Sequence, residues 1–178
     1  MDNDERGGSV LVVDDEPAMQ KVLHLGLESS GFRVTACGNG MEAIELLSGS
    51  SIDPDCILLD TRMPVMTGLE ALPRIKRLRP NSPVVMLTAF NDLETGLASL
   101  KSGAFDYIVK PARLQQIGET ISRAMQFRAV LLENERLARK NEEYRLQLEM
   151  MVEERTRELQ TAYRKLRQMN IQIGRAHV

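Results

Sequence analysis

Short apolar runs recur along the first part of the chain, and stretches with helical spacing separate them. Runs rich in Val, Ile and Leu begin near residues 10, 32, 56, 84 and 105. The intervals of roughly 20 to 28 residues leave room for one helix after each run. The pattern therefore predicts five strand-helix units, and strands that alternate with helices form a parallel sheet.

Four helices are predicted between these runs from apolar residues three and four positions apart. They span about Ala18 to Ser29, Gly40 to Leu47, Leu69 to Leu78 and Asn91 to Lys101. Gly31 stands where a glycine commonly ends a helix, and Pro80 closes the third helix. The fourth helix contains Gly96 and small residues, so we expect it to be the least stable of the set.

The pattern changes beyond Pro111, where no further proline and only two glycines occur. Every seventh residue from Ile117 to Ile173 is apolar at eight of nine places. Because a stripe of this period must be buried against another helix, we expect a coiled coil over 126–172 and a homodimer through it. Asn134 and Asn141 can hold its register. The alternative is a charged, solvated helix that frays when alone.

Composition narrows the class of protein. A chain of 178 residues with 43% hydrophobic content can form one ordinary domain and an extension. Residues 1–111 carry 10 basic and 16 acidic side chains, whereas residues 112–178 carry 13 and 9. The positive charge of the second part is spread around a helix and is not interleaved with aromatic residues, so we expect no direct binding of nucleic acid.

We expect a cytoplasmic protein without a membrane partner. The N-terminal residues are acidic and lack the apolar stretch of a signal peptide, and we expect a flexible tail over 1–8. No apolar run approaches the ~18 residues of a membrane span. Cys37 and Cys56 fit neither a CxxC pair nor a zinc pattern, which predicts two buried, reduced thiols.

Polar residues stand at the ends of four predicted strands. Asp14 and Asp15 follow the first apolar run, Asp60 ends the third, Thr88 follows the fourth, and Lys110 follows the fifth. The carboxyl ends of parallel strands lie on one edge of the sheet, where such folds place their chemistry. We therefore expect these five side chains to share a pocket.

A pocket with three carboxylates needs either protonation or a cation to offset their repulsion. Oxygen donors without thiolate or imidazole favour Mg²⁺, with Mn²⁺ as the other fit. In such a pocket Asp60 can attack a phosphoryl group, Lys110 and the metal can neutralise the phosphoryl oxygens, and Thr88 can donate a hydrogen bond. The expected product is an aspartyl phosphate.

Four motifs occur in order along residues 9–125. They are VLVVDDEP at Val10–Pro17, DTRMPVMTG at Asp60–Gly68, Thr88-Ala89, and FDYIVKP at Phe105–Pro111. In order and spacing they resemble the receiver domain of two-component response regulators. The resemblance implies a doubly wound, flavodoxin-like α/β fold with five parallel strands in the order 2-1-3-4-5, and a coiled-coil linker helix beyond it.

The resemblance also implies roles for single residues. Asp60 is expected to be the phosphoacceptor for a sensor histidine kinase or a phosphotransfer protein. Asp15 and Asp60 are expected to bind Mg²⁺ with the backbone carbonyl of Arg62, and Asp14 to assist through water. Lys110 is expected to contact the phosphoryl group.

A switch is implied as well, in which Thr88 moves toward the phosphoryl group and Tyr107 turns inward to fill the space. The peptide bond between Lys110 and Pro111 is expected to be cis, which costs little before proline. The change at the surface would pass through the C-terminal helix to an output domain absent from this chain.

Two other functions share some of these features. Phosphatases with a nucleophilic Asp and Mg²⁺ place a second acid two residues after the nucleophile, but Arg62 stands there in this chain. A coiled-coil scaffold with an idle pocket would not need the acids, Thr88 and Lys110 together. We therefore expect a signalling phosphoacceptor and no enzyme beyond self-phosphotransfer and self-dephosphorylation.

The segment from Glu153 to Leu159 resembles the helical linkers that join receivers to output domains. The last six residues, 173–178, can be encoded by ATC GGA AGA GCA CAC GTC, which matches a common sequencing-adapter read. We expect them to be a non-native end of a truncated reading frame. Resequencing past codon 172 tests this expectation.

Overall fold

The computed structural model describes residues 7–49, 52–89 and 93–175. The chain divides into two compact units, Met1–Leu132 and Glu133–Val178. The tail expected over 1–8 and the end expected to be non-native at 173–178 lie largely outside the described residues and side chains.

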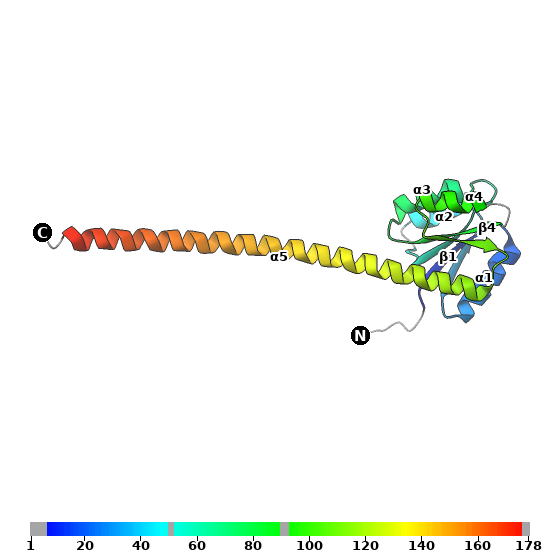
Figure 1. The fold of residues 1–178 in the computed structure, drawn as a ribbon, viewed down its shortest axis with the longest axis horizontal. Coiled ribbons are helices and arrows are strands. Elements are labelled where there is room, and N and C mark those ends of the chain that lie inside the picture. Colours follow the sequence, from blue (N-terminus) through cyan, green and yellow to red (C-terminus); the bar gives the residue numbers. More distant parts are fainter. Residues whose placement is uncertain (1–6, 50–51, 90–92, 176–178) are drawn as a thin grey trace. The chain divides into compact units, whose positions relative to one another are not determined.

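Five parallel strands form the sheet of the first unit (Figure 1). They are β1 Ser9–Val13, β2 Arg33–Cys37, β3 Cys56–Asp60, β4 Val84–Ala89 and β5 Asp106–Lys110. Their order in the sheet is β2-β1-β3-β4-β5, with all neighbouring pairs parallel. The predicted fold class and the strand order implied by the resemblance are confirmed.

Helices cover both faces of this sheet. They are α1 Pro17–Ser29, α2 Gly40–Ser48, α3 Gly68–Leu78, α4 Leu93–Lys101 and α5 Leu114–Arg175. Figure 1 shows α2, α3 and α4 over one face and α1 with the first part of α5 over the other. The predicted helices are present at nearly the predicted ends, and the long C-terminal helix is confirmed.

Alternation along the strands divides the core into two clusters. Leu11 and Val13 of β1 pack toward the α2 and α3 face, whereas Val10 and Val12 pack toward α1 and α5. All of β3 is buried, as its continuous apolar sequence predicts for a central strand with both faces covered.

Both cysteines lie in this core, one in each cluster, and both are free. Burial raises the pKa of the Cys37 and Cys56 thiols to about 12. The prediction of two buried, reduced thiols is confirmed.

The start of α5 belongs to the core of the first unit. Ile117, Ile121 and Ala124 are buried in the cluster that also holds α1. The predicted seven-residue stripe counted Ile117 and Ala124 as positions that need a partner helix. That part of the prediction is wrong, because the sheet of the same chain already covers them.

Arg128 attaches α5 to the loop before β3. Its side chain is only 8% exposed and forms ion pairs with Asp53 at 2.5 Å and with Asp55. Asp55 also accepts hydrogen bonds from the backbone N–H of Ser9 at 2.8 Å and from its hydroxyl at 3.0 Å. Asp53 and Asp55 thus join α5 to β1 and β3.

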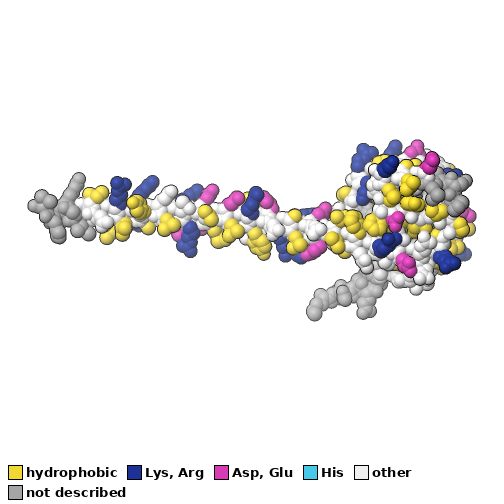
Figure 2. Space-filling view, viewed as in Figure 1, with side chains coloured by type: hydrophobic (Ala, Val, Ile, Leu, Met, Phe, Trp, Pro, Cys, Tyr) yellow, Lys and Arg dark blue, Asp and Glu magenta, His cyan; other side chains and the backbone are white. Residues whose placement is uncertain are grey.

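The second unit is the rest of α5. Every described side chain from residue 133 to 171 is exposed, and Figure 2 shows hydrophobic groups among charged ones along the helix. Ion pairs three residues apart support it, such as Arg136 with Glu133 at 2.6 Å and Arg145 with Glu142 at 2.8 Å. Such pairs contribute only about 0.2–0.5 kcal/mol each, so they do not explain the stability of so long a helix. Among the described residues, no helix is both long and apolar enough to cross a membrane.

The Arg128 contacts predict a loss of stability on truncation. We expect Arg128→Ala to lower the free energy of unfolding by roughly 1–3 kcal/mol, because two carboxylates lose a buried charged partner. Arg123→Ala is the matched control, since Arg123 is 63% exposed, with an ion pair to Asp106 at 3.2 Å and a hydrogen bond to the Thr120 hydroxyl at 3.3 Å; its cost should stay within about 1 kcal/mol. Urea unfolding measures both, and equal costs would contradict the role given to Arg128.

Candidate functional site

The loop after β1 holds two acids in different environments. The side chain of Asp14 is 1% exposed, and its Oδ1 accepts a hydrogen bond from the backbone N–H of Glu16 at 2.9 Å. The backbone of Asp14 is also held, since its N–H donates to the Cys37 carbonyl and its own carbonyl accepts from Gln20 Nε2. Asp15 is exposed. One carboxylate is therefore fixed inside the site and the other lies at its rim.

Asp60 ends β3 beside these acids and is only 8% exposed. Its Oδ1 accepts a hydrogen bond from the backbone N–H of Arg62 at 3.2 Å. The loop then returns, and the N–H of Gly68 at the start of α3 donates to the carbonyl of Thr61 at 3.1 Å. A Cβ atom on Gly68 would overlap the backbone oxygen of Asp60. Only glycine therefore lets α3 begin this close to Asp60.

The loop between Asp60 and α3 has further constraints at its tip and its end. Val65 has φ of 67° although it is β-branched, and Met66 N–H donates to the Pro64 carbonyl across it at 2.7 Å. This tight turn is strained for valine. Thr67 and Glu70 form a capping box that starts α3.

Lys110 joins the two buried acids. Its Nζ lies 2.8 Å from Oδ2 of Asp14 and 2.6 Å from Oδ2 of Asp60. The peptide bond between Lys110 and Pro111 is cis, as predicted. The strand end thus brings a cation between carboxylates that stand 46 residues apart in the sequence.

The three acids form one cluster. Asp14, Asp15 and Asp60 each offer a carboxylate oxygen, and these oxygens lie within 4.8 Å of one another. The donor set is made of oxygen, which suits a hard divalent ion such as Mg²⁺. A single ammonium cannot neutralise three carboxylates, so the cluster retains a net negative charge that a cation would offset.

Electrostatics separate the roles of Asp60 and Lys110. Burial raises the pKa of the Asp60 carboxyl above its usual value, although hydrogen bonding and charge from Lys110 act in the opposite direction. Burial alone would lower the pKa of Lys110, but hydrogen bonds to Asp14 and Asp60 outweigh it and raise that pKa. Lys110 therefore remains a cation, while the charge on Asp60 is costly without a further positive partner.

Thr88 and Tyr107 lie on the neighbouring strands. Thr88 is fully buried and follows Leu87, which is the register partner of Asp60. Tyr107 is partly buried against the core, and its ring lies close to α4, where a Cβ on Gly96 would be 3.0 Å from it. The structure thus brings the four charged residues together and places Thr88 one residue along β4 from the partner of Asp60.

Two contributors to the site were not predicted. Gln20 fastens the loop after β1 through the carbonyls of Asp14 and Cys37, at 2.6 and 3.3 Å. A glutamine in an amphipathic helix has no local pattern that reveals such a contact. Gly68 was noted as part of a motif, but its steric role depends on the path of the loop.

The contact at Gly68 predicts a strong effect of one methyl group. Gly68→Ala should lower the free energy of unfolding by about 2–3 kcal/mol, because the new Cβ overlaps the Asp60 carbonyl and the chain must shift. Gly118→Ala, where a Cβ meets open space within α5, should instead raise it by roughly 0.5–1 kcal/mol. Chemical denaturation measures the free energy of unfolding of both variants. If Gly68→Ala is as stable as the wild type, the loop after Asp60 can shift freely and the steric argument is wrong.

The raised pKa of Asp60 predicts a pH-dependent gain from neutralising it. As pH rises, the unfolded chain loses the Asp60 proton first, so ionisation of Asp60 lowers the stability of the fold. Without divalent ions, the free energy of unfolding of Asp60→Asn should therefore be about 1 kcal/mol higher than that of the wild type near pH 7.

Thermal or urea unfolding across pH measures this difference. It should shrink toward acid pH, where Asp60 is protonated in the wild type as well. It should also shrink on adding Mg²⁺, which binds the wild-type cluster more tightly. A variant less stable than the wild type at neutral pH would contradict the argument.

Comparison with known proteins agrees with this geometry. A family model described as the response regulator receiver domain matches residues 10–122. Regulatory protein AtoC of Escherichia coli (strain K12) is 35% identical over 121 residues, which are 68% of this chain and 26% of AtoC. The DNA-binding transcriptional regulator NtrC of the same organism is 38% identical over 118 residues, or 66% of this chain and 25% of NtrC. The chain thus spans about a quarter of the length of these relatives.

Solved structures match over a similar range. A response regulator receiver domain protein from Clostridium thermocellum has a TM-score of 0.67 at 28% identity, and the match covers 70% of this chain and 99% of that one. The crystal structure of adenylate cyclase from Rhodopirellula baltica has a TM-score of 0.70 at 31% identity, and the match covers 75% of this chain and 98% of that one. On the family match over residues 10–122, the sheet order and the sequence relatives, this chain belongs to the response regulator receiver domain family of two-component signal transduction.

Proposed function

We propose that Asp60 accepts a phosphoryl group from a phosphohistidine of a sensor histidine kinase or a phosphotransfer protein. The observation that carries this proposal is the position of Lys110, whose ammonium contacts both Asp60 and Asp14 beside the three-carboxylate cluster. Positive groups fixed at such a place stabilise the charge on a transferring phosphoryl group.

The acidic cluster supports Mg²⁺ as the cofactor, with Mn²⁺ as an alternative. We assign Asp15, Asp60 and the backbone carbonyl of Arg62 as ligands, with Asp14 acting through water. When bound, the ion supplies positive charge that offsets the carboxylates and the phosphoryl oxygens.

The transfer exchanges one bond for another. The P–N bond of the phosphohistidine breaks, and its electron pair stays on the imidazole nitrogen while a carboxylate oxygen of Asp60 forms the new P–O bond. Lys110 already contacts this carboxylate, and its ammonium can pair with the phosphoryl oxygens after the transfer. The Thr88 hydroxyl donates a hydrogen bond to the phosphoryl group. Later hydrolysis of the acyl phosphate by water restores Asp60, so the chain acts as a transient carrier.

Phosphorylation is read through Thr88 and Tyr107. Movement of Thr88 toward the phosphoryl group leaves space that the ring of Tyr107 fills. The absence of a side chain on Gly96 supports this role, because it lets the Tyr107 ring pack closely against α4. When the ring moves, the surface made by α4 and β5 changes. The charge added at Asp60 is thereby converted into a change of structure at that surface.

The long helix α5 connects this change to an output domain. We propose that two copies of the chain associate through α5, since many of its large hydrophobic side chains between Phe127 and Ile171 are exposed. Dimerisation would shield these groups and hold a helix that is marginal alone.

Phosphorylation of the purified chain tests the proposal. Incubation with acetyl phosphate and Mg²⁺ should add one phosphoryl group to the wild type, seen by intact mass, and none to Asp60→Ala. Lys110→Ala should reduce the rate of labelling by at least about tenfold, because a fixed charge on the transferring group is lost.

The other possible outcomes identify other functions. Continuous release of phosphate without accumulation of the phosphorylated form would identify a phosphatase. An unlabelled wild type would identify a scaffold with an idle pocket. Labelling of Asp60→Ala to the same extent would place the phosphoacceptor elsewhere.

A further inference from the structure

The first turns of α5 have one side buried in the receiver core, so only the other side can meet a partner. Ile117, Ile121 and Ala124 are buried against the sheet, so this side of the helix cannot meet a partner. Leu131 also turns toward the receiver, where it lines a groove with Phe105 and is not fully exposed.

Phe127 and Val130 mark the outer face at this point, although the ring of Phe127 also packs on that of Phe105, with centroids 5.3 Å apart, and lines the same groove as Leu131. The side chains of Phe127 and Val130 are 48% and 59% exposed. From them, alternating steps of three and four residues reach a series of exposed hydrophobic groups with two asparagines between them. The series is Phe127, Val130, Asn134, Leu137, Asn141, Tyr144, Leu148 and Met151. Asparagine in place of the first hydrophobic residue of a heptad is typical of parallel two-stranded coiled coils.

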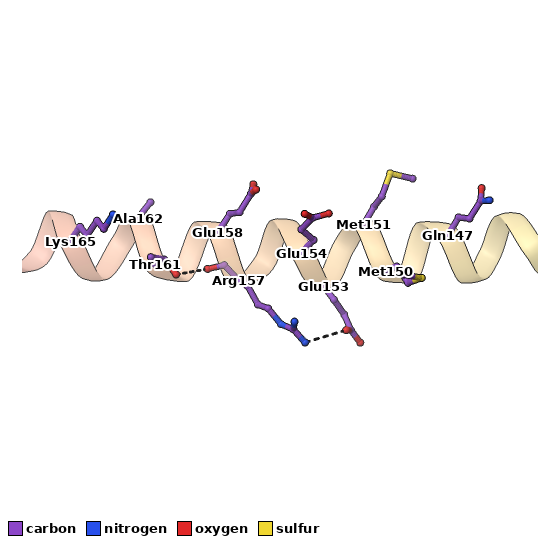
Figure 3. A pocket seen from close by; sticks show the side chains of 10 residues that line it. All are labelled: Gln147, Met150, Met151, Glu153, Glu154, Arg157, Glu158, Thr161, Ala162 and Lys165. Carbon is purple, nitrogen blue, oxygen red and sulfur yellow. Dashed lines mark hydrogen bonds and ion pairs between the residues drawn. The ribbon is translucent and has the colours of Figure 1, made fainter.

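This phase fails beyond Met151. The same steps lead to Arg155, Glu158, Ala162 and Lys165, three of which are charged, and Figure 3 shows Glu154 and Glu158 on the side of the helix that bears Met151. A second apolar series with the same spacing starts four residues after Arg155. It consists of Leu159, Ala162, Leu166 and Met169.

We infer that α5 forms a parallel dimer with a second copy of this chain through two seams that differ in phase by four residues, with the break within Val152–Glu158. The inference rests on the proposed dimerisation and specifies its register. A four-residue insertion in a heptad pattern locally unwinds the coiled coil instead of ending it. The broken segment is charged, with ion pairs of Arg155 to Glu158 at 2.9 Å and Arg157 to Glu153 at 3.6 Å within one helix.

The partner is a second copy because the seam is self-complementary. Asn134 and Asn141 recur at equivalent positions of both chains in a parallel pair, so each amide meets its own copy. The break then places a weakly packed segment between the receivers and the distal seam. Twist or separation of the receivers is absorbed or transmitted at that segment, which gives α5 a defined point of regulation.

Single cysteines distinguish the possible registers. Tyr144→Cys and Leu166→Cys lie on the two proposed seams, and Arg145→Cys and Lys165→Cys are the matched neighbours. In the full chain under mild copper-phenanthroline oxidation, the first two should form interchain disulfides at least tenfold faster than their neighbours. The native Cys37 and Cys56 are buried and do not compete.

Each other outcome overturns a defined part of the inference. If Arg145→Cys and Leu166→Cys are the two variants that cross-link fast, α5 has one unbroken seam in the phase of Leu131. If Tyr144→Cys and Lys165→Cys are the fast variants, the unbroken seam is in the phase of Val130. Cross-linking at no position, with a monomer in sedimentation equilibrium, overturns the dimer itself. None of these results bears on phosphorylation of Asp60, so the two proposals fail separately.

Deletions test the break independently. Removing the four residues Glu153–Thr156 brings both series into one phase, and the dimer dissociation constant should fall at least tenfold. Removing the seven residues Val152–Glu158 leaves the phase difference in place and should not tighten the dimer. Equal effects of the two deletions would show that no break exists.

Discussion

The site depends on one ammonium group held between two buried carboxylates. Lys110 contacts Asp14 at 2.8 Å and Asp60 at 2.6 Å, and Asp14 has almost no access to water. Without this cation, two acids would face each other in a poorly solvated place, where their repulsion is weakly screened. One ammonium does not neutralise three carboxylates, so a divalent ion bound here would offset the remaining negative charge.

Backbone packing gives this charge arrangement its geometry. The absence of a side chain at Gly68 lets α3 start against the Asp60 carbonyl, and the capping box of Thr67 and Glu70 fixes where that helix begins. The loop that follows Asp60 is therefore short and constrained. Strain at Val65, at the tip of the loop, is a consequence of the same tight path.

Helix α5 serves two environments in succession. Its first turns complete the core of the receiver, and Arg128 ties it to Asp53 and Asp55 at the end of the sheet away from the acids. Its later turns are exposed and carry large hydrophobic side chains, which are unfavourable on a helix that is surrounded only by water.

The sequence alone determined the class of fold and most of the acidic site. Apolar runs at regular intervals predicted the strands and helices, and Asp14, Asp15, Asp60 and Lys110 could be grouped because strand ends share an edge. Tertiary structure decided what depends on distant contacts. It showed that Ile117 and Ala124 face their own sheet, that Arg128 pairs with acids far away in the chain, and that Gly68 touches Asp60. Periodicity gives the face of a helix but not its partner, and sequence spacing carries no record of which groups folding brings together.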